Sequence, residues 1–256
     1  MRYLRSEFRR SFLSYKFLIG ITGVAFAQVL SIYKIAGINT SVYATYVRAV
    51  YFIPYSLSFI FCTVPYAQSF CEDIEYGYIR LITIRKDLKF YVKARIVCIC
   101  LSSIITMILG TLLFISIAHM KVPWLSEVDH LDQDILAVIW LKTGHYILYF
   151  MLRAFFWGLL AGILAVLSAY LSLFWLNKLF VISIPFITLY ALIYFMRILF
   201  KNIPQMDVAL IFNPSYNAWG NKTISFIWPI GLTVLIISII EVSIYHKLRQ
   251  EDNKEK

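Results

Sequence analysis

Apolar and polar residues alternate along the chain in long blocks. Six apolar runs are separated by short polar segments, and each run is long enough to form a helix that crosses a bilayer. Such a crossing takes about 20 consecutive, mainly apolar residues. The pattern therefore predicts an all-α integral membrane protein with six transmembrane helices. We expect the spans at residues 17–36, 51–70, 96–120, 145–170, 179–200 and 223–246.

A long polar segment at residues 71–95 separates the second span from the third. A short loop rich in lysine and arginine stays in the cytoplasm under the positive-inside rule. This loop therefore orients every span, and an even number of spans places both termini in the cytoplasm. We expect residues 247–256 to form a charged cytoplasmic tail. The basic residues of the loop are Arg80, Arg85, Lys86, Lys89, Lys93 and Arg95.

Composition supports the membrane assignment. Of the 256 residues, 61% are hydrophobic and only 15% are charged, whereas soluble domains carry about 25% charged residues. A net charge of +10 can indicate nucleic-acid binding, but here the excess falls on the predicted cytoplasmic side. We interpret it as an orientation signal and an attraction to anionic lipids, and we expect no nucleic-acid partner.

Residues 1–16 predict an amphipathic helix lying on the inner leaflet. A cleaved signal peptide is the competing interpretation, because a basic start and an apolar run precede the small-residue pattern Ala25-Phe-Ala27. The apolar run continues beyond Ala27, which favours an uncleaved span. The apolar face comprises Leu4, Phe8, Phe12 and Tyr15, and the basic face comprises Arg2, Arg5, Arg9 and Arg10.

The outer segment after the third span predicts an interfacial helix at residues 126–142. Ser126 can cap it with Asp129 three residues later, and the flanking Trp124 and Trp140 are typical of a membrane interface. Its acidic residues raise the alternative of a metal site, but they lack the spacing and the glycine of an EF-hand. We therefore expect a solvated acidic face and no bound metal.

The fourth span contains small residues at four-residue spacing, namely Ala154, Gly158 and Gly162. Small residues let two helix backbones approach closely, so we expect this span to be tightly packed, either within the chain or against a second copy. Arg153 lies well inside the same span. An arginine at that depth faces a polar cavity, pairs with a partner or extends outward to the interface, and we select it as a candidate transport-path residue.

Several catalytic signatures are absent from the sequence. It contains no Gly-x4-Gly-Lys-Ser/Thr loop for nucleotide phosphates and no His-Glu-x-x-His motif. We therefore predict no catalytic residues and no cofactor bound by this chain. If the protein is a pump, its energy comes from another polypeptide. The cysteines, which lack metal or redox spacing and are expected to fill apolar space, are Cys62, Cys71, Cys98 and Cys100.

The loop at residues 71–95 carries an ordered series of acidic, glycine, apolar and basic positions. The series is Asp73, Glu75 and Gly77, then apolar residues 79–84, then Arg85 and Lys86, then Lys93 at the next span. It resembles the first cytoplasmic loop of permeases in the ABC type-2 exporter family, and Asn213-Pro214 is similar to a position before their last span. The family usually has a proline ahead of the basic pair, where this chain has Thr83.

This resemblance implies a permease subunit in which the loop couples the spans to a separate ATPase. It implies two ATP-binding subunits that bind ATP and magnesium, and a second permease subunit, identical or related. An amphipathic or hydrophobic substrate, such as a peptide, an antibiotic or a lipid-like compound, would cross a bacterial plasma membrane. The coupling residues it implies are Asp73, Glu75, Gly77, Tyr78, Ile79, Leu81, Ile82, Arg85 and Lys86.

The alternative is a six-span membrane enzyme or sensor that works without an ATPase. It explains the same spans, but it leaves the acidic, glycine and basic series as ordinary solvated surface.

Overall fold

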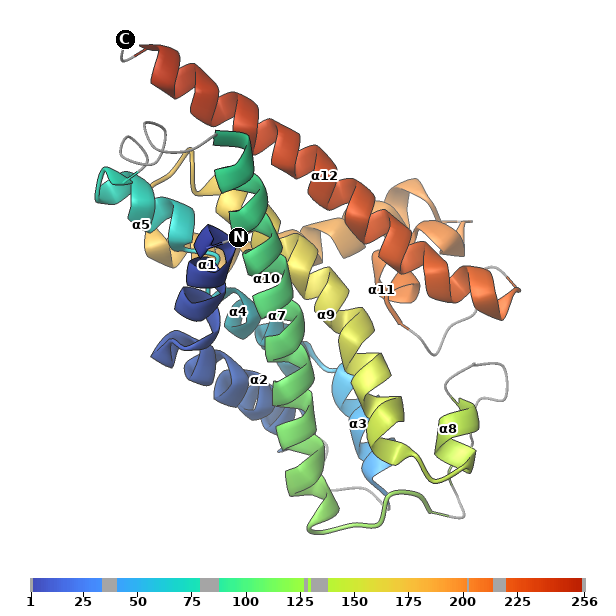
Figure 1. Ribbon diagram of the computed structural model, residues 1–256. Helices are drawn as coiled ribbons and strands as arrows, with labels where there is room; N and C mark the ends of the chain where they lie inside the picture. Colours follow the sequence, from blue (N-terminus) through green and yellow to red (C-terminus); the bar gives the residue numbers. More distant parts are fainter. Residues whose placement is uncertain are drawn as a thin grey trace.

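The computed structural model describes residues 2–33, 41–78, 88–126, 129, 138–201, 203–213 and 220–254. Every regular element in these ranges is helical, in agreement with the predicted all-α class (Figure 1). The short helices are α1 (Arg2–Phe12), α3 (Val42–Val50), η1 (Ile53–Ser56), α4 (Leu57–Thr63), α5 (Ser69–Glu75), α8 (Val138–Lys142), η2 (Pro204–Met206) and α11 (Val208–Ile211).

Within the described ranges, five helices are long and apolar enough to cross a membrane. A bent pair, formed by α3 and the stretch Ile53–Thr63, turns through 78° and makes a sixth crossing if it counts as one. This is the architecture of a multi-pass membrane protein. The five long helices are α2 (Tyr15–Tyr33), α7 (Leu88–His119), α9 (Tyr146–Leu171), α10 (Lys178–Leu199) and α12 (Lys222–Lys254).

The predicted second span, residues 51–70, does not form one continuous helix. It is divided among η1, α4, a turn at residues 64–68 and the start of α5. Pro54 lies in the first turn of η1, where its missing amide hydrogen is not needed. Pro65 comes just after α4 and cannot donate the hydrogen bond that would extend that helix. The two prolines therefore break the expected span rather than only kinking it.

Two helices extend beyond the predicted spans. α7 begins at Leu88, so the last part of the predicted cytoplasmic loop is the first turns of a long helix. α12 continues through Lys254, so the described part of the predicted tail is also helical. The helical backbone thus continues past the apolar stretch at the start of α7 and at the end of α12.

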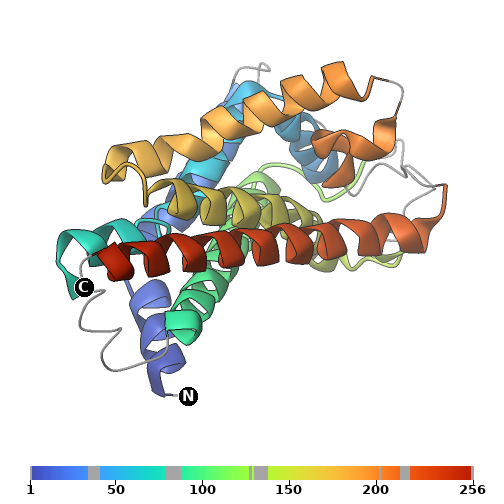
Figure 2. The same ribbon diagram turned by 90° about the horizontal axis from the view of Figure 1, so that it is seen from above.

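α9 lies at the centre of the helix packing. It contacts α4, α7, α10 and α12, and Figure 2 shows it between α10 and α12. Its small residues face α7: a Cβ atom added to Gly158 would lie 3.1 Å from Ile104 Cα, and one added to Gly162 would lie 2.9 Å from Cys100 Sγ. Ala154, one turn earlier on the same face, is fully buried. This close approach lies within one chain.

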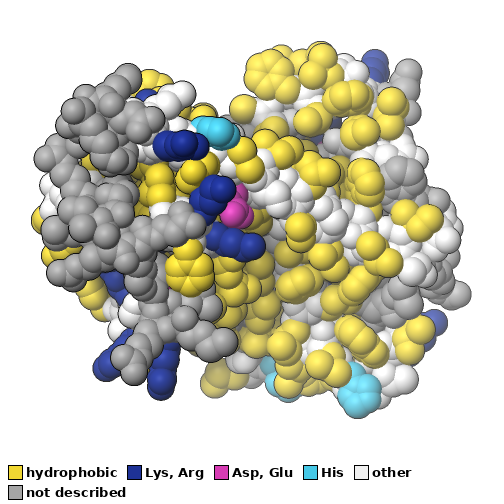
Figure 3. Space-filling view, turned by 45° about the horizontal axis from the view of Figure 1, so that its top comes forward, with side chains coloured by type: hydrophobic (Ala, Val, Ile, Leu, Met, Phe, Trp, Pro, Cys, Tyr) yellow, Lys and Arg dark blue, Asp and Glu magenta, His cyan; other side chains and the backbone are white. Residues whose placement is uncertain are grey.

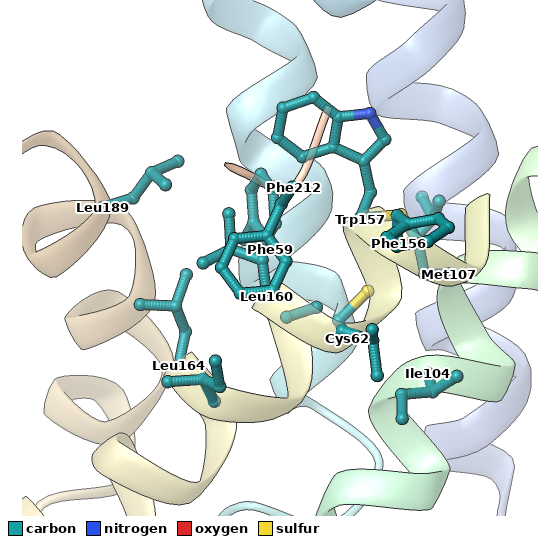
Figure 4. Packing of buried hydrophobic residues seen from close by; sticks show 14 of the residues in the cluster. Phe59, Cys62, Ile104, Met107, Phe156, Trp157, Leu160, Leu164, Leu189 and Phe212 are labelled. Atoms are coloured by element: carbon teal, nitrogen blue, oxygen red, sulfur yellow. The ribbon is translucent and has the colours of Figure 1, made fainter. Parts of the chain in front are cut away.

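A hydrophobic cluster fills the space around α9. Trp157 packs edge-on against Tyr55 and Phe59, with ring centroids 5.8 and 6.2 Å away. Figure 4 shows Trp157 and Phe59 together with Phe212, which reaches the cluster from the segment after α11. The cluster therefore holds the broken second span against the central helix.

α10 and α12 lie at the edge of the bundle. Only 22% of the apolar stretch of α10 and 17% of that of α12 are buried, compared with 78% in α9. Hydrophobic side chains cover much of the face in Figure 3. Exposed apolar surface of this extent is typical of helices that face lipid or another membrane subunit.

Candidate functional site

α5 is the first described element of the predicted coupling loop, and its two acidic site residues lie in different environments. Asp73 is 1% exposed, whereas the side chain of Glu75 is 50% exposed. Gly77 follows with φ 67°, a left-handed conformation that glycine adopts without strain. Tyr78 comes next and is exposed. The coupling residues that lie outside the described ranges are Ile79, Leu81, Ile82, Arg85 and Lys86.

Arg95 of α7 is the centre of a buried charge network. Its Nη2 atom forms an ion pair with Asp73 of α5, and its Nη1 atom lies 3.3 Å from Glu7 Oε2 of α1. One arginine therefore joins carboxylates from two helices that are far apart in the sequence. Glu7, Asp73 and Arg95 are 6%, 1% and 1% exposed, and they are termed the buried triad below.

Two tyrosines add hydrogen bonds to the buried triad. Arg95 Nη1 donates to Tyr66 Oη at 2.8 Å, and the Tyr66 hydroxyl donates to Glu7. The Tyr91 hydroxyl donates to Asp73 Oδ2 at 2.9 Å. The guanidinium also lies 5.3 Å from the ring centroid of each tyrosine. Buried ions are tolerated when they have partners of this kind.

A partly exposed layer of charges surrounds the buried triad. Arg10 Nη1 lies 3.3 Å from Asp73 Oδ1, and Arg10 Nη2 lies 3.4 Å from Glu72 Oε2. Lys16, at the start of α2, lies 2.5 Å from the other oxygen of Glu72. The Arg10 side chain is 45% exposed, so solvent screens this layer and its pairs contribute little to stability.

The far end of α5 contacts the start of α10. Lys178 Nζ lies 2.5 Å from Glu75 Oε2 and 5.8 Å from the ring centroid of Tyr76. Tyr76 and Tyr78 remain 66% and 50% exposed, and their ring centroids are 6.2 Å apart. α5 therefore combines a buried anchor at Asp73 with an exposed aromatic end, termed the α5 tip, made of Glu75, Tyr76 and Tyr78.

Arg153 of α9, the candidate transport-path residue, is 2% exposed. Its Nη1 atom donates to Tyr149 Oη at 2.9 Å and its Nη2 atom donates to Asn213 Oδ1 at 3.5 Å. The guanidinium lies 5.4 Å from the ring centroid of Tyr46 in α3. In this conformation Arg153 joins α9 to α3 and to the segment after α11, and its partners are different from those of the buried triad.

Metal-binding potential is absent from the part of the chain that the structure describes. No group of three histidine, cysteine or acidic side chains converges there.

Most of the predicted acidic outer helix lies outside the described residues, apart from Ser126, Asp129 and α8. The Ser126 amide donates to Asp129 Oδ2 at 2.8 Å, as in the reciprocal half of a capping box. Cys62, Cys71 and Cys98 are buried, and Cys100 is partly buried.

Sequence reasoning did not assign Glu7, Tyr66, Tyr91 or Arg95 to a site. The available signal was Glu7, the only acidic residue among residues 1–16. Arg95 contributed to the predicted orientation as a basic loop residue, but the structure places it inside the protein. Asp73 is likewise buried, and it pairs with Arg95 of its own chain.

Comparisons with protein-family models, curated proteins and solved structures found no significant match to this chain. The buried triad and the α5 tip are the features of the described residues that point to a function.

Proposed function

We propose that the chain is the membrane-spanning permease subunit of an ATP-binding-cassette exporter. It moves an amphipathic or hydrophobic substrate across the cell membrane, with ATP hydrolysed by a separate subunit. The α5 tip is the observation that carries this proposal. It combines exposed aromatic residues with a buried, ion-paired anchor at Asp73.

The α5 tip has the chemistry of a docking surface for another protein. Tyrosine is enriched at protein interfaces, where its large ring is buried and its hydroxyl finds a partner. Two tyrosines lie here beside a half-exposed carboxylate, on the side of the protein that the positive-inside rule assigns to the cytoplasm. An ATPase subunit binds from that side.

The buried anchor gives such a contact a mechanical consequence. Asp73 lies two residues before Glu75 and is paired with Arg95 of the long helix α7. A displacement of the α5 tip would therefore act on α7, and through the close approach of Gly158 and Gly162 on the central helix α9. Nucleotide bound to the ATPase and substrate bound to the permease would then each favour one of two arrangements of the helices. Two ATPase subunits and a second permease subunit complete the proposed assembly, in a bacterial plasma membrane.

Mutation of the α5 tip tests this proposal directly. The full-length protein is purified in mild detergent from its native membranes, and the co-purifying subunits are identified by mass spectrometry and assayed for ATP hydrolysis. We expect an ABC-type ATPase to co-purify with the parent chain and not with the Tyr76→Ala/Tyr78→Ala variant. Tyr194→Ala, which alters a 64% exposed tyrosine of α10, is the matched control and should retain the ATPase.

Three results would contradict the proposal. ATP hydrolysis by the isolated chain, or the absence of any ATPase from the parent preparation, would favour the enzyme or sensor alternative. Normal ATPase binding by the Tyr76→Ala/Tyr78→Ala variant would exclude the α5 tip as the docking surface.

A further inference from the structure

α1 has two chemically different sides. Glu7 and Ser11, four residues apart, are buried, whereas Arg5 and Arg9, also four residues apart, are exposed. Residues at this spacing share one face of a helix. One side of α1 therefore packs on the protein through Glu7, and another side carries positive charge outward.

Exposed apolar side chains follow directly after α1 in the chain. Leu13, Tyr15 and Leu18, at the junction of α1 and α2, are 77%, 71% and 65% exposed. α2 is one of the helices long and apolar enough to cross a membrane, so these side chains lie where a membrane surface would be. Apolar side chains next to arginines are typical of segments that bind an interface containing anionic lipid.

We propose that α1 is a clamp that responds to anionic lipid. Arg5 and Arg9 bind negatively charged headgroups, and Glu7, on the packed side of α1, connects this contact through Arg95 to Asp73 of α5. Arg95 can pair with both carboxylates only while α1 is docked. Anionic lipid therefore stabilises docked α1 and, with it, docked α5, whether or not an ATPase is bound to the α5 tip.

The native cysteines provide the measurement. Cys71 lies on α5, two residues before Asp73, and is 1% exposed. Burial also raises the pKa of the Cys71 thiol, so it reacts slowly with thiol reagents while α5 is docked. Cys62 of α4 is fully buried and reports general unfolding. The full-length protein is placed in nanodiscs of phosphatidylcholine, with or without phosphatidylglycerol, and labelling by a soluble maleimide is quantified at each cysteine by mass spectrometry.

We expect phosphatidylglycerol to slow the labelling of Cys71 in the parent protein and to leave Cys62 unchanged. A basic residue near an anionic surface shifts such an equilibrium by roughly fivefold, so two arginines give a readily measured effect. Arg5→Gln/Arg9→Gln should remove the lipid dependence, so that Cys71 is labelled in both lipids at the rate of the parent in phosphatidylcholine alone. Glu7→Gln should accelerate the labelling of Cys71 in both lipids.

The clamp is refuted if the parent labels equally in both lipids, or if Arg5→Gln/Arg9→Gln retains the lipid effect. Labelling of Cys71 at the parental rate in Glu7→Gln would also refute it. If Glu7→Gln exposes Cys62 as well, Tyr66→Phe replaces it, because this change keeps every charge and removes hydrogen bonds to Glu7 and Arg95. Tyr66→Phe should then accelerate Cys71 alone, and a parental rate would overturn the proposal.

Discussion

Replacement of Arg95 by methionine should destabilise the protein strongly. Methionine fills much of the same space, but the change leaves the carboxylates of Glu7 and Asp73 buried without their shared cation. Removing one partner of a buried ion pair costs about 3–5 kcal/mol. One kcal/mol corresponds to about 2–4 °C in a chain of this size, so the melting temperature should fall by roughly 6–20 °C.

A variant of the triad without charges separates two causes of lost stability, namely buried carboxylates left without a cation and loss of side-chain packing. The variant Glu7→Gln/Asp73→Asn/Arg95→Met removes all three charges of the buried triad. The new amide at position 7 can still accept from Tyr66, and the one at position 73 can still accept from Tyr91. Replacing a whole buried ionic group by neutral residues is often close to neutral. We therefore expect the triple variant to recover most of the stability lost in Arg95→Met.

Thermal unfolding in detergent, followed by fluorescence-detected size-exclusion chromatography, measures both variants. Arg197→Met is the matched control, because the Arg197 side chain is 62% exposed and pairs with Asp207 at 3.0 Å. An exposed pair contributes less than about 1 kcal/mol, so the control should melt like the parent. If the triple variant is as unstable as Arg95→Met, then the unpaired buried carboxylates are not the cause of the lost stability, and this prediction is wrong.

Three further predictions concern packing, orientation and the buried arginine of α9. Gly158→Ala should lower the free energy of unfolding by about 1–3 kcal/mol, because the added Cβ atom would press against α7. Gly231→Ala is the control, because its added Cβ atom would lie in open space, and it should melt like the parent. Equal melting temperatures for the two variants would contradict this packing. An impermeant thiol reagent should label Tyr78→Cys only from the cytoplasmic side and Lys121→Cys only from outside, and the reverse pattern would overturn the topology. Tyr149→Phe removes the hydroxyl that accepts a hydrogen bond from Arg153, and it should lower the free energy of unfolding by about 1–3 kcal/mol. An unchanged melting temperature would show that this hydrogen bond contributes little.

Long apolar helices were predictable because their signal is local. The fourth span, expected at residues 145–170, appears as α9 at Tyr146–Leu171, and the fifth, expected at 179–200, appears as α10 at Lys178–Leu199. Hydropathy alone determines where such a helix can cross a bilayer. The packed face of α9 was also visible in its small residues, because close approach of two helices requires them.

The second span was not predictable in the same way. Its composition suits a membrane, and both Pro54 and Pro65 were visible in the sequence. Whether a proline kinks a helix or ends it depends on what satisfies the freed backbone groups, and neighbouring helices decide that. Here the chain forms η1 and α4 and then turns before α5.

The buried triad was invisible to pattern analysis because its members have no local relation. Glu7, Asp73 and Arg95 lie on three helices, and only the tertiary packing brings them together. A hydropathy pattern predicts that each charged residue is exposed to solvent. Arg95 therefore marked a solvated loop in the sequence, whereas in the structure it organises the interior at that end of α7.

A buried ionic triad at this position gives the protein a defined geometry rather than additional stability. Apolar contacts alone would let α1 and α5 slide along α7 at little cost, because apolar packing has no preferred direction. A shared guanidinium with fixed donor directions does not allow this. Arg95 accordingly fixes α5 through Asp73, two residues before the exposed Glu75. In the proposed coupling role, the α5 tip would transmit a displacement only if its base were held in one register, and the buried triad is the contact that fixes this base.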